Sequence, residues 1–390
     1  MRNGKKVWKI KKPIYGLKDS AMNWYKTIQS DLKRLGCIQS TLDSTVFMFR
    51  VGDELKGLFL CHVDDFLFSL GDPAFTSQII EKLKGTYIIS RQDENEQFTY
   101  VGLQLKHHPE GIAISQPGFI SKIEPEQVTC NREENDNILE GEMKTAYRRL
   151  LGKINWIAHQ SRPDLSFNAY SFSLLSKEPT VKDLKQLNKL ASKIKVGPQH
   201  LMLSKLKEDD LRIICFSDAS FANLPPDKTS SGEGFLTFLA DSTGKCALLN
   251  WKSKKISRVV HSTISAEGLS LVDSLGDAYY IRNIIEEILY NDPRKKAISI
   301  HVYVDSNQLF KAIESTRMVT EKLLRINIAE LKQTILRHEN NIKLFWIPSK
   351  LMLSDSLTKS GAANDRLLKV METGQLNMEE LRDHRACLKV

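Results

Sequence analysis

The sequence of 390 residues lacks the features that would place it in a membrane or in an oxidising compartment. No apolar run approaches the roughly 18 residues that a membrane-spanning helix needs. The segment Met1 to Lys6 is polar and contains no apolar core of a signal peptide. The six cysteines include no Cys-x-x-Cys pair, which favours free thiols in a reducing compartment. We therefore expect an intracellular protein, in the cytoplasm or the nucleus, that does not engage a membrane.

Internal repeats and low-complexity tracts are also missing, and the length allows two or three domains. The hydrophobic fraction of 41% and the charged fraction of 26% are ordinary for folded protein. The net charge of +9 is unevenly spread, because residues 1–34 contain ten Lys or Arg and two Asp, a local charge of +8. A basic arm with interleaved aromatic residues suits a nucleic-acid backbone, and a solvated helix face is the alternative.

The first half of the sequence mixes strand and helix signals. A short strand and a helix are predicted within residues 1–35, a hairpin over 45–51 and 56–63, a helix over 74–84, strands over 87–90 and 98–105, and helices over 147–160 and 163–175. Asp64 and Asp65 interrupt the apolar run that continues to Leu70. They predict an acidic turn between two strands, with a metal site as the rarer alternative.

Three acids of the second half occupy three different predicted settings. Residues 211–218 form an apolar strand that is predicted to end at Asp218, and residues 298–305 form another that ends at Asp305. Glu267 lies in the first turns of a predicted helix. Acids at strand ends beside an acid on a helix can converge and hold two divalent cations about 4 Å apart. Each acid taken alone would more often be a cap or a solvated surface residue.

Several motifs occur in a fixed order along the chain. They are Tyr-Gly-Leu-Lys-Asp-Ser (15–20) followed by Trp-Tyr (24–25), His-Val-Asp-Asp (62–65), Tyr-Val-Gly-Leu-Gln-Leu (100–105), Tyr-Arg-Arg-Leu-Leu-Gly-Lys-Ile (147–154), Ser-Asp-Ala-Ser-Phe (217–221), Ser-Ala-Glu (265–267), Asp-Ser-Asn (305–307) and Asp-Ser-Leu-Thr-Lys (355–359). In this order the motifs resemble the reverse transcriptase and RNase H segment of a copia-type LTR retrotransposon Pol polyprotein. The resemblance covers residues 1–360.

The resemblance implies a multidomain fold of the α+β and α/β classes. Residues 1–110 would form part of a reverse-transcriptase palm, which is ferredoxin-like in the family. Residues 111–205 would form a helical thumb or connection. Residues 206–360 would form an RNase H-like domain with a mixed sheet, and residues 361–390 a C-terminal tail.

For the palm, the resemblance implies two sets of site residues. Asp64 and Asp65 match the hairpin whose aspartates bind the catalytic metal in the family. Tyr15, Gly16 and Lys18 match a motif that handles the template. A further metal-binding Asp and the fingers lie upstream of this motif in the family, in a part that this sequence does not contain. We therefore expect a polymerase remnant rather than a complete RNA-directed DNA polymerase.

For the RNase H part, the resemblance implies a complete set of four acids, in which Asp355 joins the three described above. Asp218, Glu267, Asp305 and Asp355 would ligate two Mg²⁺, with Mn²⁺ as the alternative, and cleave RNA in RNA–DNA hybrids as an endonuclease. A basic stretch would follow the hybrid backbone, with an exposed charged strand end as the alternative reading. It consists of Lys252, Lys254, Lys255 and Arg258.

Two other interpretations of the whole chain stay open. The first is a catalytically silent retroelement relic, or a module that binds nucleic acid without turnover. The second is a fragment of a longer polyprotein that works only with other Pol segments as partners. The sequence favours ribonuclease H over DNA polymerase as the activity that this chain retains.

Overall fold

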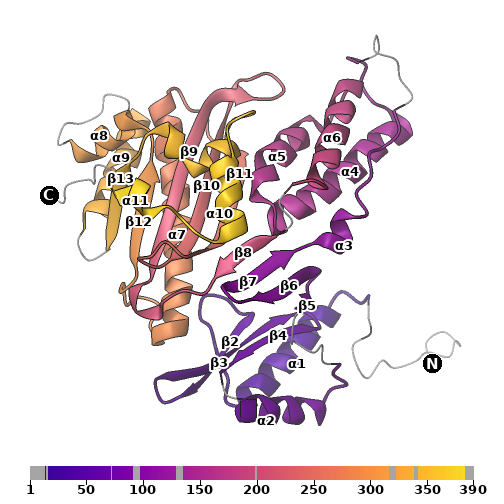
Figure 1. Ribbon diagram of the computed structural model, residues 1–390, viewed down its shortest axis with the longest axis vertical. Helices are drawn as coiled ribbons and strands as arrows, with labels where there is room; N and C mark the ends of the chain where they lie inside the picture. The colour runs from indigo at the N-terminus through magenta and orange to yellow at the C-terminus, as the bar shows by residue number, and fades with distance from the viewer. Residues whose placement is uncertain are drawn as a thin grey trace, which may run out of the picture. The chain divides into compact units, whose positions relative to one another are not determined.

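The computed structural model describes residues 14, 16–71, 73–90, 97–128, 135–197, 200–315, 322–337 and 341–382. The chain divides into two compact units (Figure 1), one made of residues 1–92 and 283–295 and the other of residues 93–282 and 296–390. Both units contain helices and strands, and the predicted multidomain α/β class is confirmed. The domain limits predicted at 110, 205 and 360 stay predictions.

The first unit contains a four-stranded antiparallel sheet, two complete helices and, in residues 283–290, the end of a third. Its elements are α1 (Ser20–Arg34), β1 (Ile38–Gln39), β2 (Val46–Val51), β3 (Glu54–His62), β4 (Asp65–Leu70) and α2 (Pro73–Lys84), with the strands paired in chain order. The predicted hairpin is β2 and β3, and Gly52 in its turn has a φ of 61°, which glycine adopts without strain. Phe47, Phe49 and Phe59 form the core with apolar residues of both helices.

Two strand predictions near the end of this unit need correction. Residues 87–90 form no strand, although their side chains alternate between half-buried and exposed. Tyr87 packs edge-on against Trp24 at 5.3 Å between ring centroids, so burial there comes from a helix rather than from a strand partner. The single strand predicted over 98–105 is two strands, β5 (Gln97–Tyr100) and β6 (Leu103–His108). The short strand predicted before α1 lies outside the described residues.

The second unit begins with a sheet and a group of helices. The sheet joins β5 and β6 to β7 (Gly111–Ser115) and β8 (Leu201–Ser204). The helices are α3 (Pro117–Ile120), α4 (Gly141–Gln160), η2 (Pro163–Leu165), α5 (Ser166–Leu175) and α6 (Val181–Ile194). Tyr147, Ile154 and Leu187 lie in their common core, and Thr180 and Asp183 form a capping box that starts α6. The helices predicted over 147–160 and 163–175 are α4 and α5.

A five-stranded mixed sheet forms the rest of the second unit. Its strands are β9 (Arg212–Leu224), β10 (Ser230–Ala240), β11 (Cys246–Lys255), β12 (Ser299–Val304) and β13 (Ile342–Trp346), in the order β11-β10-β9-β12-β13. The pairs among β9, β10 and β11 are antiparallel, and β12 runs parallel to both β9 and β13. The strands predicted over 211–218 and 298–305 correspond to β9 and β12.

Helices cover both faces of this sheet. They are α7 (Thr263–Tyr290), α8 (Asn307–Glu314), α9 (Lys322–Leu336), α10 (Asp365–Thr373) and α11 (Met378–Arg382), with the single turns η3 (Glu208–Asp210), η5 (Ser349–Leu351) and η6 (Leu353–Leu357). Although α7 spans 28 residues, neither it nor any other helix in the described part of the chain is long and apolar enough to cross a membrane.

Successive side chains of β9 point to opposite faces of the sheet. Cys215 and Ser217 face α7: the thiol of Cys215 lies 3.8 Å from the carbonyl oxygen of Ser274, and the hydroxyl of Ser217 lies 3.0 Å from that of Ser270. Phe216 lies in the apolar core shared with α10 and α11 on the opposite face. Asp218, two residues further on, therefore lies on the face of α10 and α11.

Candidate metal centre

Two of the predicted acids lie on neighbouring parallel strands. The prediction that the strand ends at Asp218 is wrong, because β9 continues to Leu224 and places Asp218 in its middle. Asp305 directly follows β12, as predicted. The register pairs Phe216 with Tyr303, so each acid lies two residues beyond the same pair. Adjacent strands are about 4.8 Å apart, and the two carboxylates can therefore meet.

The third acid of the cluster comes from a different kind of element. Asp355 lies in the 3-10 helix η6. Carboxylate oxygens of Asp218, Asp305 and Asp355 lie within 4.8 Å of one another, the one group of three or more potential metal ligands found among the described residues. Glu267, in the second turn of α7, lies outside this group of three. The structure thus brings together three of the four predicted acids at ligand distance.

Burial makes Asp218 and Glu267 costly to ionise in the absence of a cation. Asp218 is 0% exposed, and burial, together with the charges of Asp305 and Asp355, raises its pKa to about 7 against the opposing effects of Lys359 and Thr358. Glu267 is 5% exposed, and burial and the charges of Asp218 and Asp305 raise its pKa well above the ordinary value. Its Oε2 atom has no hydrogen-bond partner. A divalent cation would supply the partner that this oxygen-rich set lacks.

A glycine opposite Asp218 lets the η6 segment approach the sheet. Gly234 of β10 pairs with Asp218 across the antiparallel ladder. A Cβ atom at Gly234 would lie 2.8 Å from both the Cβ of Leu357 and the Cγ2 of Thr358, closer than real Cβ contacts. The segment that carries Asp355 therefore packs directly on bare backbone. Sequence reasoning missed this role, because only the fold shows which residue faces Asp218.

Small polar residues fix α7 beside the same strand. The hydroxyl of Ser270 donates to the carbonyl oxygen of Asp218 at 2.8 Å, and both residues are fully buried. Glu267 lies three residues earlier, on the same side of the helix. The carboxylate of Glu267 accepts a hydrogen bond from the backbone of Ala219, the residue after Asp218, so the start of α7 lies beside this part of β9. The sequence signal, a serine in an apolar helix, was too common to be singled out.

Two residues just after η6 contact the acids directly. The hydroxyl of Thr358 donates a hydrogen bond to Oδ2 of Asp218. The ammonium of Lys359 pairs with Asp355 and lies 3.5 Å from both carboxylate oxygens of Asp218. Sequence analysis included both residues in a motif and gave neither a role.

The predicted basic stretch divides into two kinds of residue. Lys252, Lys255 and Arg258 are exposed. Lys254 is half-buried and forms ion pairs with Glu233 at 2.7 Å and with Asp273 at 2.6 Å. Three of the four side chains are therefore available to a ligand, whereas Lys254 also has a structural role in holding β11 to β10 and α7.

The residues of the N-terminal motifs lie together in the first unit. Asp64 lies on the turn between β3 and β4, and Asp65 is the first residue of β4, both exposed. The indole nitrogen of Trp24 donates to the carbonyl oxygen of Val63 in this turn. Gly16 and Lys18 are exposed before α1, and Tyr15 lies outside the described residues. Among the described residues, no third metal-ligating side chain joins Asp64 and Asp65.

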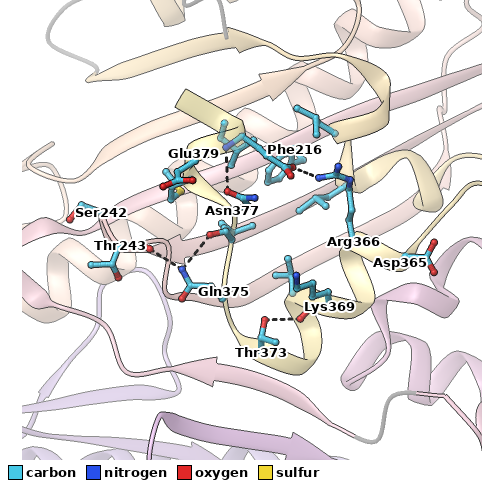
Figure 2. Close-up of a pocket in the computed structure, with 17 residues that line it drawn as sticks. Phe216, Ser242, Thr243, Asp365, Arg366, Lys369, Thr373, Gln375, Asn377 and Glu379 are labelled. Carbon is cyan, nitrogen blue, oxygen red and sulfur yellow. Dashed lines mark hydrogen bonds and ion pairs between the residues drawn. The ribbon is translucent and has the colours of Figure 1, made fainter. Parts of the chain in front are cut away.

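A cavity of about 870 Å³ lies elsewhere in the second unit. Figure 2 shows that Phe216 lines it together with Thr243, Lys369, Gln375 and other residues of the C-terminal segment. The amide of Gln375 donates to the carbonyl oxygen of Thr243 at 2.8 Å. None of the four acids lines this cavity, so it is distinct from the candidate metal centre.

Comparison with known proteins identifies relatives of this chain. Residues 2–135 match the model of the family described as reverse transcriptase (RNA-dependent DNA polymerase). The Retrovirus-related Pol polyprotein from transposon RE1 of Arabidopsis thaliana is 26% identical over 294 residues, 72% of this chain and 19% of the relative. The Transposon TyH3 Gag-Pol polyprotein of Saccharomyces cerevisiae is 26% identical over 392 residues, 91% of this chain and 21% of the relative.

Solved structures give weaker likenesses. A foamy viral protease-reverse transcriptase in complex with RNA/DNA hybrid is 14% identical, with a TM-score of 0.48 over 90% of this chain and 40% of the other. LC11-RNase H1 in complex with RNA/DNA hybrid is 19% identical, with a TM-score of 0.29 over 40% of this chain and 99% of the other. Both TM-scores are below 0.5, and the assignment below rests on the sequence matches.

The chain spans about a fifth of the length of the curated relatives that it matches. The match over residues 2–135 spans the motifs at 15–20, 24–25, 62–65 and 100–105, and the resemblance to this family is confirmed. The chain is similar to Pol polyproteins of copia-type retrotransposons, and its first third carries the match to the reverse transcriptase family.

Proposed function

We propose that the region containing the five-stranded sheet hydrolyses the RNA strand of RNA–DNA hybrids, with two divalent cations held by Asp218, Glu267, Asp305 and Asp355. The observation that carries this proposal is the convergence of three carboxylates within 4.8 Å, on a β-strand, after a second strand and on a 3-10 turn. Mg²⁺ fits an all-oxygen ligand set, and Mn²⁺ accepts the same ligands.

The burial of the acids supports the same conclusion. A buried carboxylate normally finds a hydrogen-bond partner or a counter-ion. Oε2 of Glu267 has no hydrogen-bond partner, and Asp218 lies beside two further carboxylates with Thr358 and Lys359 as its polar contacts. A divalent cation would offset the remaining repulsion among these carboxylates and would give Oε2 of Glu267 a partner.

Each acid has a distinct task in this proposal. When bound, the two cations would lower the pKa of the attacking water and stabilise the leaving 3′ oxygen. Asp218, which neighbours Asp305 across the ladder and lies within 4.8 Å of Asp355, would hold a cation together with these two acids. Glu267 approaches from α7. The rigid sheet and the packed η6 segment keep the ligands in place before the substrate arrives.

Exposed basic residues would supply contacts to the hybrid backbone. Lys252, Lys255 and Arg258 lie on or just after β11, the strand next to β10 in the same sheet. Phosphate contacts of this kind add affinity that falls with salt and carry no sequence information. Gly16 and Lys18, with Tyr15, are proposed as a second contact to nucleic acid in the first unit.

The polymerase part is proposed to be inactive in this chain by itself. Phosphoryl transfer by two cations needs more than the two exposed carboxylates of Asp64 and Asp65. Among the described residues no third ligand joins them. The alternative function, a module that binds hybrid without cleaving it, is favoured by one observation, which is that the ammonium of Lys359 contacts two of the acids.

Cleavage of a labelled RNA–DNA hybrid tests the proposal. Purified protein should cut the RNA strand when Mg²⁺ or Mn²⁺ is present and leave it intact in EDTA. Asp218→Asn should abolish cutting while the hybrid still binds. Asp209→Asn is the matched control, because Asp209 is an exposed acid of η3 outside the cluster. Folded parent protein that binds hybrid and cuts it with neither metal would establish the binding-module alternative.

A further inference from the structure

Lys359 provides a positive charge inside the acid cluster. Its ammonium pairs with Asp355 and lies 3.5 Å from both oxygens of Asp218. The same two carboxylates belong to the group of potential metal ligands. The ammonium therefore occupies the side of these carboxylates that a metal ion bound by both would use.

The charge on Lys359 is held firmly at neutral pH. Burial acts to lower the pKa of Lys359, but the charges of Asp218, Asp355 and Asp305 outweigh it and raise the pKa above its ordinary value. In turn, Lys359 acts against the rise in the pKa of Asp218 and of Glu267. One ammonium thus relieves part of the repulsion among four clustered acids.

The side chain of Lys359 also has access to solvent. It is 41% exposed, whereas the side chain of Asp218 beside it is 1% exposed. A lysine has a flexible stem of four carbons, and its compact ammonium is readily hydrated. Lys359 can therefore leave the carboxylates for solvent without any movement of the sheet or of η6.

We propose that Lys359 is an exchangeable counter-ion of the acid cluster, which stabilises the cluster when no metal is bound and is displaced by a divalent cation. This inference rests on the proposed metal site and adds a positioning residue to it. A counter-ion that competes with the metal lowers metal affinity and raises the stability of the metal-free protein, because the two cations exclude each other from the same oxygens.

Calorimetric titration with Mn²⁺ and melting in EDTA test this inference together, in the full chain. Lys359→Met removes the charge and keeps an unbranched stem, and Lys359→Gln repeats the test with a polar end. Both variants should bind Mn²⁺ roughly fivefold or more tightly than the parent. Both should melt at a lower temperature than the parent in EDTA, and this difference should shrink when Mn²⁺ saturates the site.

Two controls isolate the position and the charge. Lys350→Met removes an exposed lysine of the neighbouring η5 turn and should bind Mn²⁺ like the parent. Lys359→Arg keeps the charge and should stay close to the parent in both measurements. If the parent binds Mn²⁺ but the two neutral variants bind it equally well or more weakly, Lys359 does not compete with the metal. If the parent binds no Mn²⁺, the metal site itself is refuted, and this inference with it.

Discussion

Two acids of the first unit, Asp64 and Asp65, and two of the second, Asp218 and Asp305, differ in their exposure and in the carboxylates near them. Asp64 and Asp65 are adjacent in sequence and exposed on a turn. Asp218 lies on β9 and Asp305 directly after the neighbouring strand β12, and both meet a third acid from η6. Both pairs belong to motifs that resemble the same family, but Asp218 is buried and a third carboxylate lies beside it and Asp305, whereas Asp64 and Asp65 are exposed. A matching motif identifies ancestry, whereas the surroundings of its acids decide what chemistry they can perform.

The largest expected difference between the two pairs concerns cleavage. Asp305→Asn should lower the rate of hybrid cleavage about 100-fold or more, because a metal ligand is lost. Asp65→Asn should leave the rate unchanged, because Asp65 is exposed in the other unit. Initial rates on a labelled hybrid at saturating Mg²⁺ measure both. Equal loss in the two variants would remove the distinction between the pairs.

The second difference is a pH dependence of metal-free stability. The folded pKa of Asp218 is about 7, above its unfolded value, so the folded state holds a proton that the unfolded state has released between about pH 4 and pH 7. The contribution of Asp218 to stability therefore falls as pH rises through this window. Relative to the parent, Asp218→Asn should gain about 2–3 kcal/mol in free energy of unfolding between pH 5 and pH 8.

Urea denaturation in EDTA at both pH values measures this gain. Asp65→Asn is the matched control and should show no comparable change, because the side chain is exposed. A difference between Asp218→Asn and the parent that stays constant or narrows from pH 5 to pH 8 would contradict the burial argument.

Packing of η6 on the sheet gives a third, smaller contrast. Gly234→Ala should cost about 1–3 kcal/mol, because its Cβ would overlap Leu357 and Thr358, and should also weaken Mn²⁺ binding. Gly276→Ala places a methyl group where nothing lies within 4 Å in the helix α7, and should be neutral or stabilising. Denaturation measures the stability of both variants, and titration with Mn²⁺ measures their metal affinity. Mn²⁺ binding by Gly234→Ala equal to that of the parent would mean that the position of η6 does not depend on its packing against Gly234.

The smallest effect concerns a buried histidine of the same sheet. Burial, with the charges of Arg212 and Lys343, lowers the pKa of His301 to about 4. The unfolded state therefore binds a proton that the folded state does not, and the stability is lost as pH falls from about 6.5 to 4. Relative to that of the parent, the free energy of unfolding of His301→Gln should rise by about 1–2 kcal/mol when the pH falls from 7 to 5. His62→Gln, at an exposed position before the Asp64 turn, should gain nothing measurable.

The sequence predicted most elements of the fold because periodicity and turn residues reflect local burial. The hairpin of β2 and β3, the helices α4 and α5 and the strands β9 and β12 all follow from such signals. Residues 87–90 show the limit: they alternate like a strand, but no strand pairs with them. Pairing depends on distant residues, which a local pattern does not contain.

The candidate site was predictable only in part. Asp218 and Asp305 stood out as acids in or after apolar strands, but Asp355 was assigned through the family resemblance alone. No role was assigned from the sequence to Gly234, Ser270 or Lys359. Gly234 and Ser270 act on an acid at least 16 residues away, and Lys359 acts on an acid four residues away on an irregular turn. Such roles become visible only when the strand register and the path of η6 are known.

One measurement on one preparation tests the central claim, that the acid cluster is catalytic and the Asp64–Asp65 turn is not. A labelled DNA primer is annealed to a longer labelled RNA template and incubated with the protein, Mg²⁺ and all four deoxynucleotides, and both strands are followed. We predict that the RNA is cut within the hybrid and that the primer is not extended. An extended primer, or RNA left intact by folded protein that binds the hybrid, would contradict this account.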